Sequence, residues 1–256
     1  MGTAKSVMVV VTHPKHPLLE DEYNEWYSDN HLPYVLFTDD FPSASRFKQS
    51  KVLKGSMTPY LALYQGDWDD TWEAQEAYAS VGRRGIGEKW NRTPGNSLEV
   101  DWWSYYRKIA ETGNPSPDVN PPHAILVTFA HPDGGMGNTA IFLSELFETW
   151  YKSFLDDMND CPLVRGSTLY RLGLRAGGDT PPRYMTVHEL SSGESDTADQ
   201  THAGIMKWMR DADLRADVAS VTEPNAPVAL DFWGYYDRII THFKASEGDL
   251  LRARGD

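Results

Sequence analysis

The chain has 256 residues, of which 40% are hydrophobic and 24% charged, and its formal net charge is −13. These proportions are typical of a soluble globular protein, and the negative charge argues against binding to nucleic acid or to anionic membrane surfaces. No apolar run approaches the roughly 20 residues that cross a bilayer, and the first residues lack the apolar core of a signal peptide, so we expect a cytoplasmic protein. The single cysteine, Cys161, excludes an internal disulfide, and we expect it to be a small, partly buried apolar residue.

The first hundred residues predict four strands and two helices. Residues 6–12 form a short run of branched apolar residues, which indicates a buried strand. Aromatic residues at three- and four-residue spacing predict a helix over 20–31, which should end there because the residue before Pro33 avoids the helical region. The other predicted elements are strands over 41–50 and 59–66, a helix over 70–81, a loop over 82–97 and a strand over 98–106.

A proline-rich segment then separates this half from a second half with the same order of elements. Residues 113–122 contain four prolines and predict a stiff linker. The elements predicted after it are a strand over 123–130, a helix over 139–156, strands over 163–172 and 183–190, a helix over 197–209 and a strand over 228–236. The polar tail, 242–256, should be disordered or draped on the surface. The predicted domains are therefore 1–112 and 123–241, joined by the linker and followed by the tail.

The two halves also share landmarks, which indicates an internal repeat. The matched segments are Trp26-Tyr27 with Trp150-Tyr151, Asp101–Ile109 with Asp231–Ile239, His13-Pro14 with His131-Pro132, Arg46 with Arg171, and Tyr64 with His188. The strand and helix order of each half is that of a ferredoxin-like βαββαβ unit. Such a unit has helices on one face of its sheet only, so two of them in one chain can pack sheet against sheet.

One stretch of the first half carries a family likeness. The helix segment from Glu22 to Pro33 is followed by the strand residues Ser45-Arg46-Phe47 and by the strand from Tyr60 to Tyr64. This combination resembles the EthD-type branch of the dimeric α+β barrel superfamily, in which a helix ends in Trp-Tyr, three residues, then His, a hydrophobic residue and Pro. The resemblance covers residues 6–109 and, more weakly, 123–239. It implies an α+β fold in which two fused ferredoxin-like units form an intramolecular dimeric α+β barrel.

The superfamily includes several kinds of enzyme, so the fold alone does not decide the function. The first hypothesis is a cofactor-independent enzyme that uses a histidine acid–base on a small aromatic or polyketide-like substrate, in an elimination, decarboxylation or cyclisation. The second is a cofactor-free monooxygenase of phenolic substrates. The third is a non-catalytic small-molecule-binding or stress-related module. Self-association of the duplicated chain as a homodimer is a further option.

His31 is the main candidate for catalysis. It lies four residues after Tyr27 and eight after Tyr23, so the three side chains should share one helical face. At a helix C-terminus the macrodipole favours the imidazolium whereas burial favours the neutral ring, and these opposed effects could hold its pKa near neutrality. The alternative is a histidine that only caps the last carbonyls of the helix.

The other candidate site residues are aromatic or cationic. Tyr27 and Tyr64 are the remaining candidate catalytic residues, because their hydroxyls could donate hydrogen bonds to a substrate oxygen. The candidate substrate-binding residues are Tyr23, Trp26 and Arg46. Core packing is the alternative for the two aromatic residues, and a structural ion pair is the alternative for Arg46, because Arg171 matches it.

The second half lacks the histidine. The position that matches His31 is Leu155, four residues after Tyr151, and no His-Leu-Pro follows it. His188 in turn replaces Tyr64, which makes it a candidate for a residual second site. The difference between the halves therefore favours a functional site in the first half.

Motifs for bound cofactors are missing from the sequence. The eight histidines are scattered and form no pair at helical spacing on a predicted helix. The glycine-rich segment 133–137 lacks the lysine of a phosphate-binding loop, and no GxSxG nucleophile elbow occurs. We therefore expect neither a metal nor another cofactor.

Overall fold

The computed structural model describes residues 4–36, 41–81, 98–115, 122–132, 140–191, 193, 196–212 and 228–243. The predicted loops at 82–97 and 133–137, most of the linker and the tail from residue 244 lie outside this part of the chain. Among the described helices, none combines the length and the apolar character that crossing a bilayer requires.

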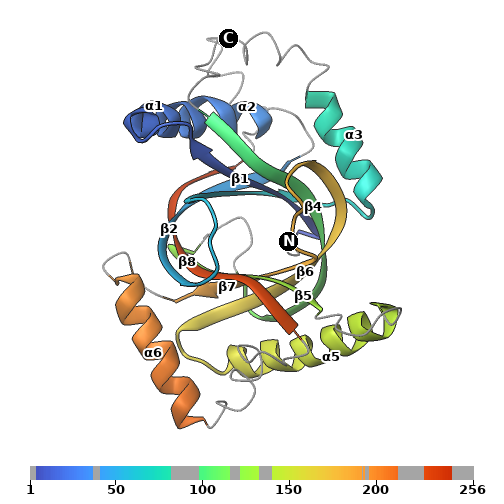
Figure 1. The fold of residues 1–256 in the computed structure, drawn as a ribbon, viewed down its shortest axis with the longest axis vertical. Helices are drawn as coiled ribbons and strands as arrows, with labels where there is room; N and C mark the ends of the chain where they lie inside the picture. Colours follow the sequence, from blue (N-terminus) through green and yellow to red (C-terminus); the bar gives the residue numbers. More distant parts are fainter. Residues whose placement is uncertain are drawn as a thin grey trace.

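Eight strands form a closed antiparallel barrel in the order β1-β3-β2-β8-β5-β7-β6-β4. The strands are β1 (Ser6–Pro14), β2 (Ser43–Lys54), β3 (Tyr60–Gly66), β4 (Leu98–Gly113), β5 (Ala124–Pro132), β6 (Val164–Gly178), β7 (Tyr184–Leu190) and β8 (Val228–Phe243). The helices are η1 (Pro17–Leu19), α1 (Glu20–Glu25), η2 (Trp26–His31), α2 (Leu32–Leu36), α3 (Thr71–Val81), α5 (Ala140–Asn159) and α6 (Ala198–Asp211). They lie outside the barrel, with α1, α2 and α3 on one side and α5 and α6 on the opposite side (Figure 1).

Each half of the chain contributes four neighbouring strands with the same relative order. The first half forms β4-β1-β3-β2 and the second forms β8-β5-β7-β6, and the halves meet where β2 pairs with β8 and β4 pairs with β6. The predicted order of strands and helices in each half is therefore found. The pairing between halves lengthens the strands beyond the prediction: β4 reaches Gly113, which was expected in the linker, and β8 reaches Phe243, two residues into the expected tail.

The strand registers show which residues of the halves correspond. Tyr64 pairs with Met8 as His188 pairs with Leu126, so Tyr64 and His188 are counterparts, as predicted. The predicted match of Arg46 with Arg171 is wrong.

Arg46 pairs with Ala62, two residues before Tyr64. In the second half, the residue two before His188 is Thr186, and it pairs with Leu169. Arg171, which pairs with Tyr184, lies two positions further along β6. The counterpart of Arg46 is therefore Leu169, because the register of the strand decides the match and the residue type does not.

Alternate residues of β1 enter two different cores. Val7, Val9 and Val11 belong to the apolar cluster inside the barrel, whereas Met8 and Val10 face the cluster under the first-half helices. Since side chains alternate along a strand and both faces of β1 are covered, its sequence reads as an unbroken apolar run.

The first helical segment does not end before Pro33. Residues 20–25 are α-helical, residues 26–31 form one π-helical stretch, and the helix then continues to Leu36. A proline inside an α-helix removes one N–H donor and its ring collides with the carbonyl four residues earlier. The wider π turn directly before Pro33 relieves that collision, so the helix continues past the proline.

A histidine from the far end of the chain completes this π turn. The N–H of Leu32 donates to the Tyr27 carbonyl, five residues earlier, and Pro33 has no N–H to offer. The Ser28 carbonyl instead accepts a hydrogen bond of 2.8 Å from Nε2 of His242, in β8. Residue 242 thus belongs to β8, whereas the sequence predicted that a tail, partly disordered or draped on the surface, begins at this position.

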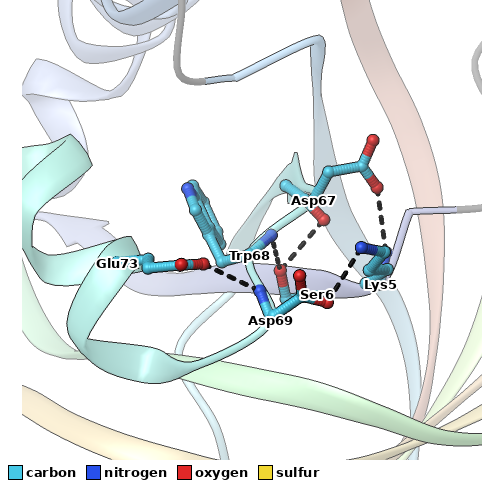
Figure 2. A network of polar contacts seen from close by, with 7 residues as sticks. Lys5, Ser6, Asp67, Trp68, Asp69 and Glu73 are labelled. Carbon is cyan, nitrogen blue, oxygen red and sulfur yellow. Dashed lines mark hydrogen bonds and ion pairs between the residues drawn. The ribbon is translucent and has the colours of Figure 1, made fainter.

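A polar network fixes the turn between β3 and α3 (Figure 2). The Ser6 hydroxyl donates to the Gly66 carbonyl at 2.9 Å and accepts from the Trp68 N–H at 3.2 Å, while Lys5 Nζ pairs with Asp69 at 2.8 Å. Trp68 is thereby folded back over Gly66, and its ring packs edge-on against Phe41 at 5.1 Å. The network thus supports the aromatic core that contains the candidate site.

We expect Gly66→Ala to destabilise the protein. A Cβ at this position would lie 2.2 Å from the Trp68 ring, so the indole would have to move out of the core, at a cost of about 1–3 kcal/mol. Urea unfolding measures the effect. Gly193→Ala is the matched control, because its Cβ would meet only Asp196 Oδ2 at 3.7 Å. Equal stabilities of the two variants would contradict the packing described for Trp68.

The first half alone should not behave as a monomer. Residues 1–112 on their own would expose the apolar inner face of the sheet and leave the edges of β2 and β4 unpaired. We expect this fragment to self-associate or aggregate in sedimentation velocity experiments. A well-behaved monomeric fragment would show that the second half is not required to cover the first.

Candidate functional site

A cavity of about 120 Å³ lies between the outer face of the first-half sheet and the η2–α2 helix. We call it the half-1 cavity. Its lining residues come from β1, η2, α2, β3 and β4 and are Met8, Val10, Thr12, Tyr27, His31, Val35, Tyr64, Leu98, Val100 and Trp103. All three predicted catalytic residues, His31, Tyr27 and Tyr64, are therefore among them. Val100 is 42% exposed, which places the mouth of the cavity at the beginning of β4.

The three side chains are in contact with one another. The ring of His31 meets Tyr27 edge-on at 4.7 Å and lies 6.4 Å from the ring of Tyr64. The Tyr64 hydroxyl donates a hydrogen bond of 3.2 Å to the Tyr27 hydroxyl. One imidazole and two phenol groups thus converge on the same small space, and all three are buried.

The other two predicted aromatic residues form the wall behind the cavity and do not line it. Trp26 stacks on His31, with ring centres 5.1 Å apart and planes inclined by 19°. Trp26 and His31 are five residues apart, which is the hydrogen-bond spacing of a π-helix. The π turn therefore places one ring above the other and allows this stacking. The hydroxyl of Tyr23 is hydrogen-bonded to Thr12 Oγ1 at 2.7 Å, so it is occupied within the protein. Trp26 and Tyr23 are therefore better placed to orient His31 and Thr12 than to contact a substrate directly.

Arg46 does not line the cavity either. It is buried, and its guanidinium carbon lies 4.5 Å from the ring centres of both Tyr23 and Tyr27. A third ring, that of Tyr60, lies 4.7 Å away. Nη1 donates to the Ser28 hydroxyl at 3.1 Å. Among the residues that the structure describes, no carboxylate forms an ion pair with Arg46, whereas Arg171 does form one, with Glu148 at 3.0 Å.

The pKa of His31 departs from the near-neutral value expected from the sequence. Burial, and second the positive charge of Arg46, lower the pKa of His31 from 6.5 to about 3. The helix continues beyond His31, so its dipole cannot stabilise the imidazolium at this point, and the expected role as a C-terminal cap is wrong. The imidazole is therefore neutral near pH 7 and can accept a proton or a hydrogen bond.

In the second half the histidine lies on the strand and an aromatic residue lies on the helix. Phe154 meets His188 edge-on at 6.2 Å and Tyr151 at 5.7 Å, much as His31 meets Tyr64 and Tyr27. These contacts identify Phe154 as the counterpart of His31, one residue before the predicted Leu155. The π turn of the first half adds the extra residue that shifts the match. An apolar side chain still replaces the histidine, so the asymmetry remains.

His188 is enclosed more tightly than His31. Its Nδ1 lies 2.7 Å from the Ser167 hydroxyl, and burial lowers its pKa from 6.5 to about 4. It does not line the half-1 cavity, nor two further cavities of about 50 and 830 Å³. A residual second pocket around His188 remains a prediction.

The remaining sequence candidates have structural roles. His13 and His131 each pair with the aspartate at the fourth position of the last strand of its half, Asp101 at 3.2 Å and Asp231 at 2.9 Å. Cys161 is buried, and burial raises the pKa of its thiol, as expected for an apolar role.

Several lining residues were missed by the sequence reasoning. Met8, Val10 and Thr12 alternate along β1 and present one face to the cavity. They occur at every second position, but the inward-facing valines between them are equally apolar. The sequence therefore shows no alternation that would mark them. Trp103 belongs to the repeated Asp-aromatic motif and was assigned no role.

A larger cleft lies elsewhere, at one mouth of the barrel. It holds about 830 Å³, includes Trp102, Phe129 and Asp231 in its lining, and contains none of the predicted site residues. We prefer the half-1 cavity as the candidate site because a histidine of shifted pKa and two phenols converge there. In the part of the chain that the structure describes, no three His, Cys, Asp or Glu side chains are grouped so as to hold a metal ion.

Comparison with known proteins identifies the fold. No protein-family model and no curated protein matches the sequence. Similar solved structures include an anthrone oxidase-like protein (10% identity, 95% of each chain, TM-score 0.53) and a candidate monooxygenase from Fusobacterium nucleatum (8% identity, 96% of this chain and 97% of that one, TM-score 0.56). A dye-decolorizing peroxidase from Bacteroides thetaiotaomicron aligns over 100% of this chain and 97% of its own, with 8% identity and a TM-score of 0.51. At such identities the likeness concerns the fold alone, and the chain has the fold of the dimeric α+β barrel proteins.

Proposed function

We propose that this protein is a cofactor-independent enzyme that acts on a small aromatic or polyketide-like molecule in the half-1 cavity. The observation that carries the proposal is the convergence of His31, Tyr27 and Tyr64 on one buried cavity from three different elements. Phe154 stands where the second half would need the histidine, so the fold itself does not require an imidazole at this position.

The neutral imidazole of His31 acts as the base in this proposal. It takes a proton from a substrate hydroxyl or from a carbon next to a carbonyl, and the electron pair stays on the substrate as an oxyanion. The hydroxyl of Tyr27 donates a hydrogen bond to that oxygen, and Tyr64 supports it by donating to Tyr27. Loss of a leaving group, loss of carbon dioxide or attack on a second carbonyl then completes an elimination, a decarboxylation or a cyclisation. The imidazolium returns its proton at the end.

The size of the cavity limits the substrate. A volume of about 120 Å³ is close to the roughly 150 Å³ of an engineered apolar cavity that binds benzene. One aromatic ring is therefore the largest rigid group that the site admits without side-chain movement. Larger polyketide-like molecules would have to extend through the mouth at Val100.

A cofactor-free monooxygenase is the second candidate. Two structural neighbours carry oxygenation in their names, the anthrone oxidase-like protein and the candidate monooxygenase. The same deprotonation by His31 would give an electron-rich phenolate, which dioxygen, as a second reactant, would then oxidise. The third candidate, a binding module, shares the cavity and lacks turnover.

Turnover assays distinguish these functions. Single-ring phenols, aromatic acids and hydroxy ketones would be incubated with the dialysed protein, with and without dioxygen, and products followed by mass spectrometry. The lyase or cyclase proposal expects product in both atmospheres, and the monooxygenase expects oxygen uptake that matches product formation. Binding without turnover of any compound would favour the module and contradict the enzyme proposal.

We also propose that the two halves are fused, duplicated ferredoxin-like units of EthD type, with residues 1–112 and 123–241 as the units. The matching strand orders and the Tyr64–His188 correspondence support this. In the same proposal the protein is cytoplasmic and binds neither nucleic acid nor membranes.

A further inference from the structure

Arg46 carries a buried positive charge that the described part of the chain does not balance. No described carboxylate forms an ion pair with the guanidinium, and Nε and Nη2 have no hydrogen-bond partner among the described residues. Glu20, which accepts a hydrogen bond from Tyr60 nearby, is already paired with Lys48 at 2.8 Å. Among the described residues, the faces of three tyrosine rings and the acceptors of Nη1 stabilise the cation.

The fold does not need this charge. Burial of an unpaired cation costs several kcal/mol, and aromatic faces offset only part of that cost. In the second half the same register position holds Leu169, which is fully buried. A leucine therefore satisfies the packing requirement at this place, and the arginine calls for a functional explanation.

We infer that the half-1 cavity takes a small aromatic monoanion, either a benzoate-like carboxylate or the phenolate or enolate that the proposed proton transfer forms, and that Arg46 selects its charge by acting through Tyr27. This inference rests on the proposed function, since it names the substrate class of the same cavity. Arg46 is a positioning residue in this scheme, because it does not line the cavity itself.

Tyr27 connects the cation to the ligand. Its ring lies 4.5 Å from the Arg46 guanidinium carbon, and its side chain lines the cavity. In a buried site of low polarity a unit charge acts over several ångströms with little screening. The chain as a whole carries a net charge of −13, which repels anions, so a preference for an anion must come from a local cation.

The bound anion would also restore the basicity of His31. The charge of Arg46 opposes protonation of the imidazole in the empty site. A ligand with one negative charge balances that cation and forms a favourable pair with an imidazolium. Binding of the correct substrate would therefore prepare the base for its proton transfer.

The test measures the ionisation of a bound probe. We choose 4-nitrophenol, because its phenolate has a visible absorbance band that the neutral phenol lacks. Titration with the whole protein over a range of pH gives the affinities of both forms. We expect the wild type to bind the phenolate at least about tenfold more tightly than the phenol, which lowers the pKa of the bound probe by at least about one unit.

Four variants locate the source of the preference. Arg46→Leu, which copies Leu169, should bind both forms about equally, whereas Arg46→Lys should keep the preference for the phenolate. Arg171→Leu removes an exposed arginine and should behave as the wild type. Because the charge is buried, high salt should leave the preference in place. Tyr27→Leu should reduce the preference, because the ring that links cation and ligand is gone.

Three results would overturn the inference. A wild type that binds phenol as tightly as phenolate would show that the cavity does not select an anion, and the aromatic-substrate proposal would survive. An Arg46→Leu variant that keeps the full preference would assign the selection to another group. Failure of the wild type to bind either form would contradict both the inference and the proposed function.

Discussion

Replacement of His31 by glutamine is expected to lower kcat/KM by about 10²–10⁴-fold, the usual contribution of a positioned general base. Glutamine keeps a hydrogen-bonding side chain of similar length but cannot accept a proton near neutral pH. The loss should therefore appear mainly in kcat, with KM changed much less. Steady-state kinetics on the substrate found in the turnover assays, with product quantified by mass spectrometry, measure the effect.

His188→Gln is the matched control. It removes the other histidine that is buried and has a lowered pKa, at the barrel position that corresponds to Tyr64. We expect nearly full activity in this variant. Circular dichroism and thermal unfolding of both variants check that the fold survives. If His31→Gln kept wild-type turnover while His188→Gln lost it, the site would belong to the second half and our assignment would be wrong.

The part of the fold that the sequence predicted depended on patterns within single elements. Every predicted strand and helix that lies in the described residues is present, because period-two and helical spacings are local properties. The three predicted catalytic residues lie together for the same reason, and their catalytic roles remain predictions. Tyr27 and His31 are four residues apart on one helix, and Tyr64 came to them through a strand whose counterpart in the second half was recognised.

Features that depend on distant partners were not predicted. The π turn at residues 26–31 needs His242, more than 200 residues later, to satisfy the Ser28 carbonyl. The polar ends of β4 and β8 looked like a linker and a tail, since only pairing with the other half makes them strands. The match of Arg46 with Arg171 followed residue identity, whereas strand register assigns Leu169.

The electrostatics of His31 illustrate the same limit. The sequence suggested that a helix end raises the pKa of His31 while burial lowers it. In the structure the helix continues, Arg46 adds a second charge, and both burial and this charge act against protonation. Neither the proline-tolerant π turn nor the buried cation beside it can be read from local spacing.

A strong dependence of stability on acid follows from the two buried histidines. The pKa values are about 3 for His31 and about 4 for His188 in the folded protein, against 6.5 for an unperturbed histidine. Between pH 6.5 and 4.5 the unfolded chain therefore binds a proton at each position and the folded chain does not. Stability is complete above pH 6.5 and falls as the pH is lowered, by about 1.4 kcal/mol per pH unit for each histidine.

At pH 4.5 the two histidines together should have removed about 5 kcal/mol of the free energy of unfolding, which is a large share of the stability of a typical domain. Urea unfolding at a series of pH values gives the slope of this free energy against pH. The slope is the useful quantity, because it does not depend on the packing cost of a substitution. His31→Gln should lower the wild-type slope by about half, and the double variant with His188→Gln should lose most of it. A His31→Gln variant with the full wild-type slope would show that His31 is protonated in the folded protein, and the neutral base in our mechanism would have to be abandoned.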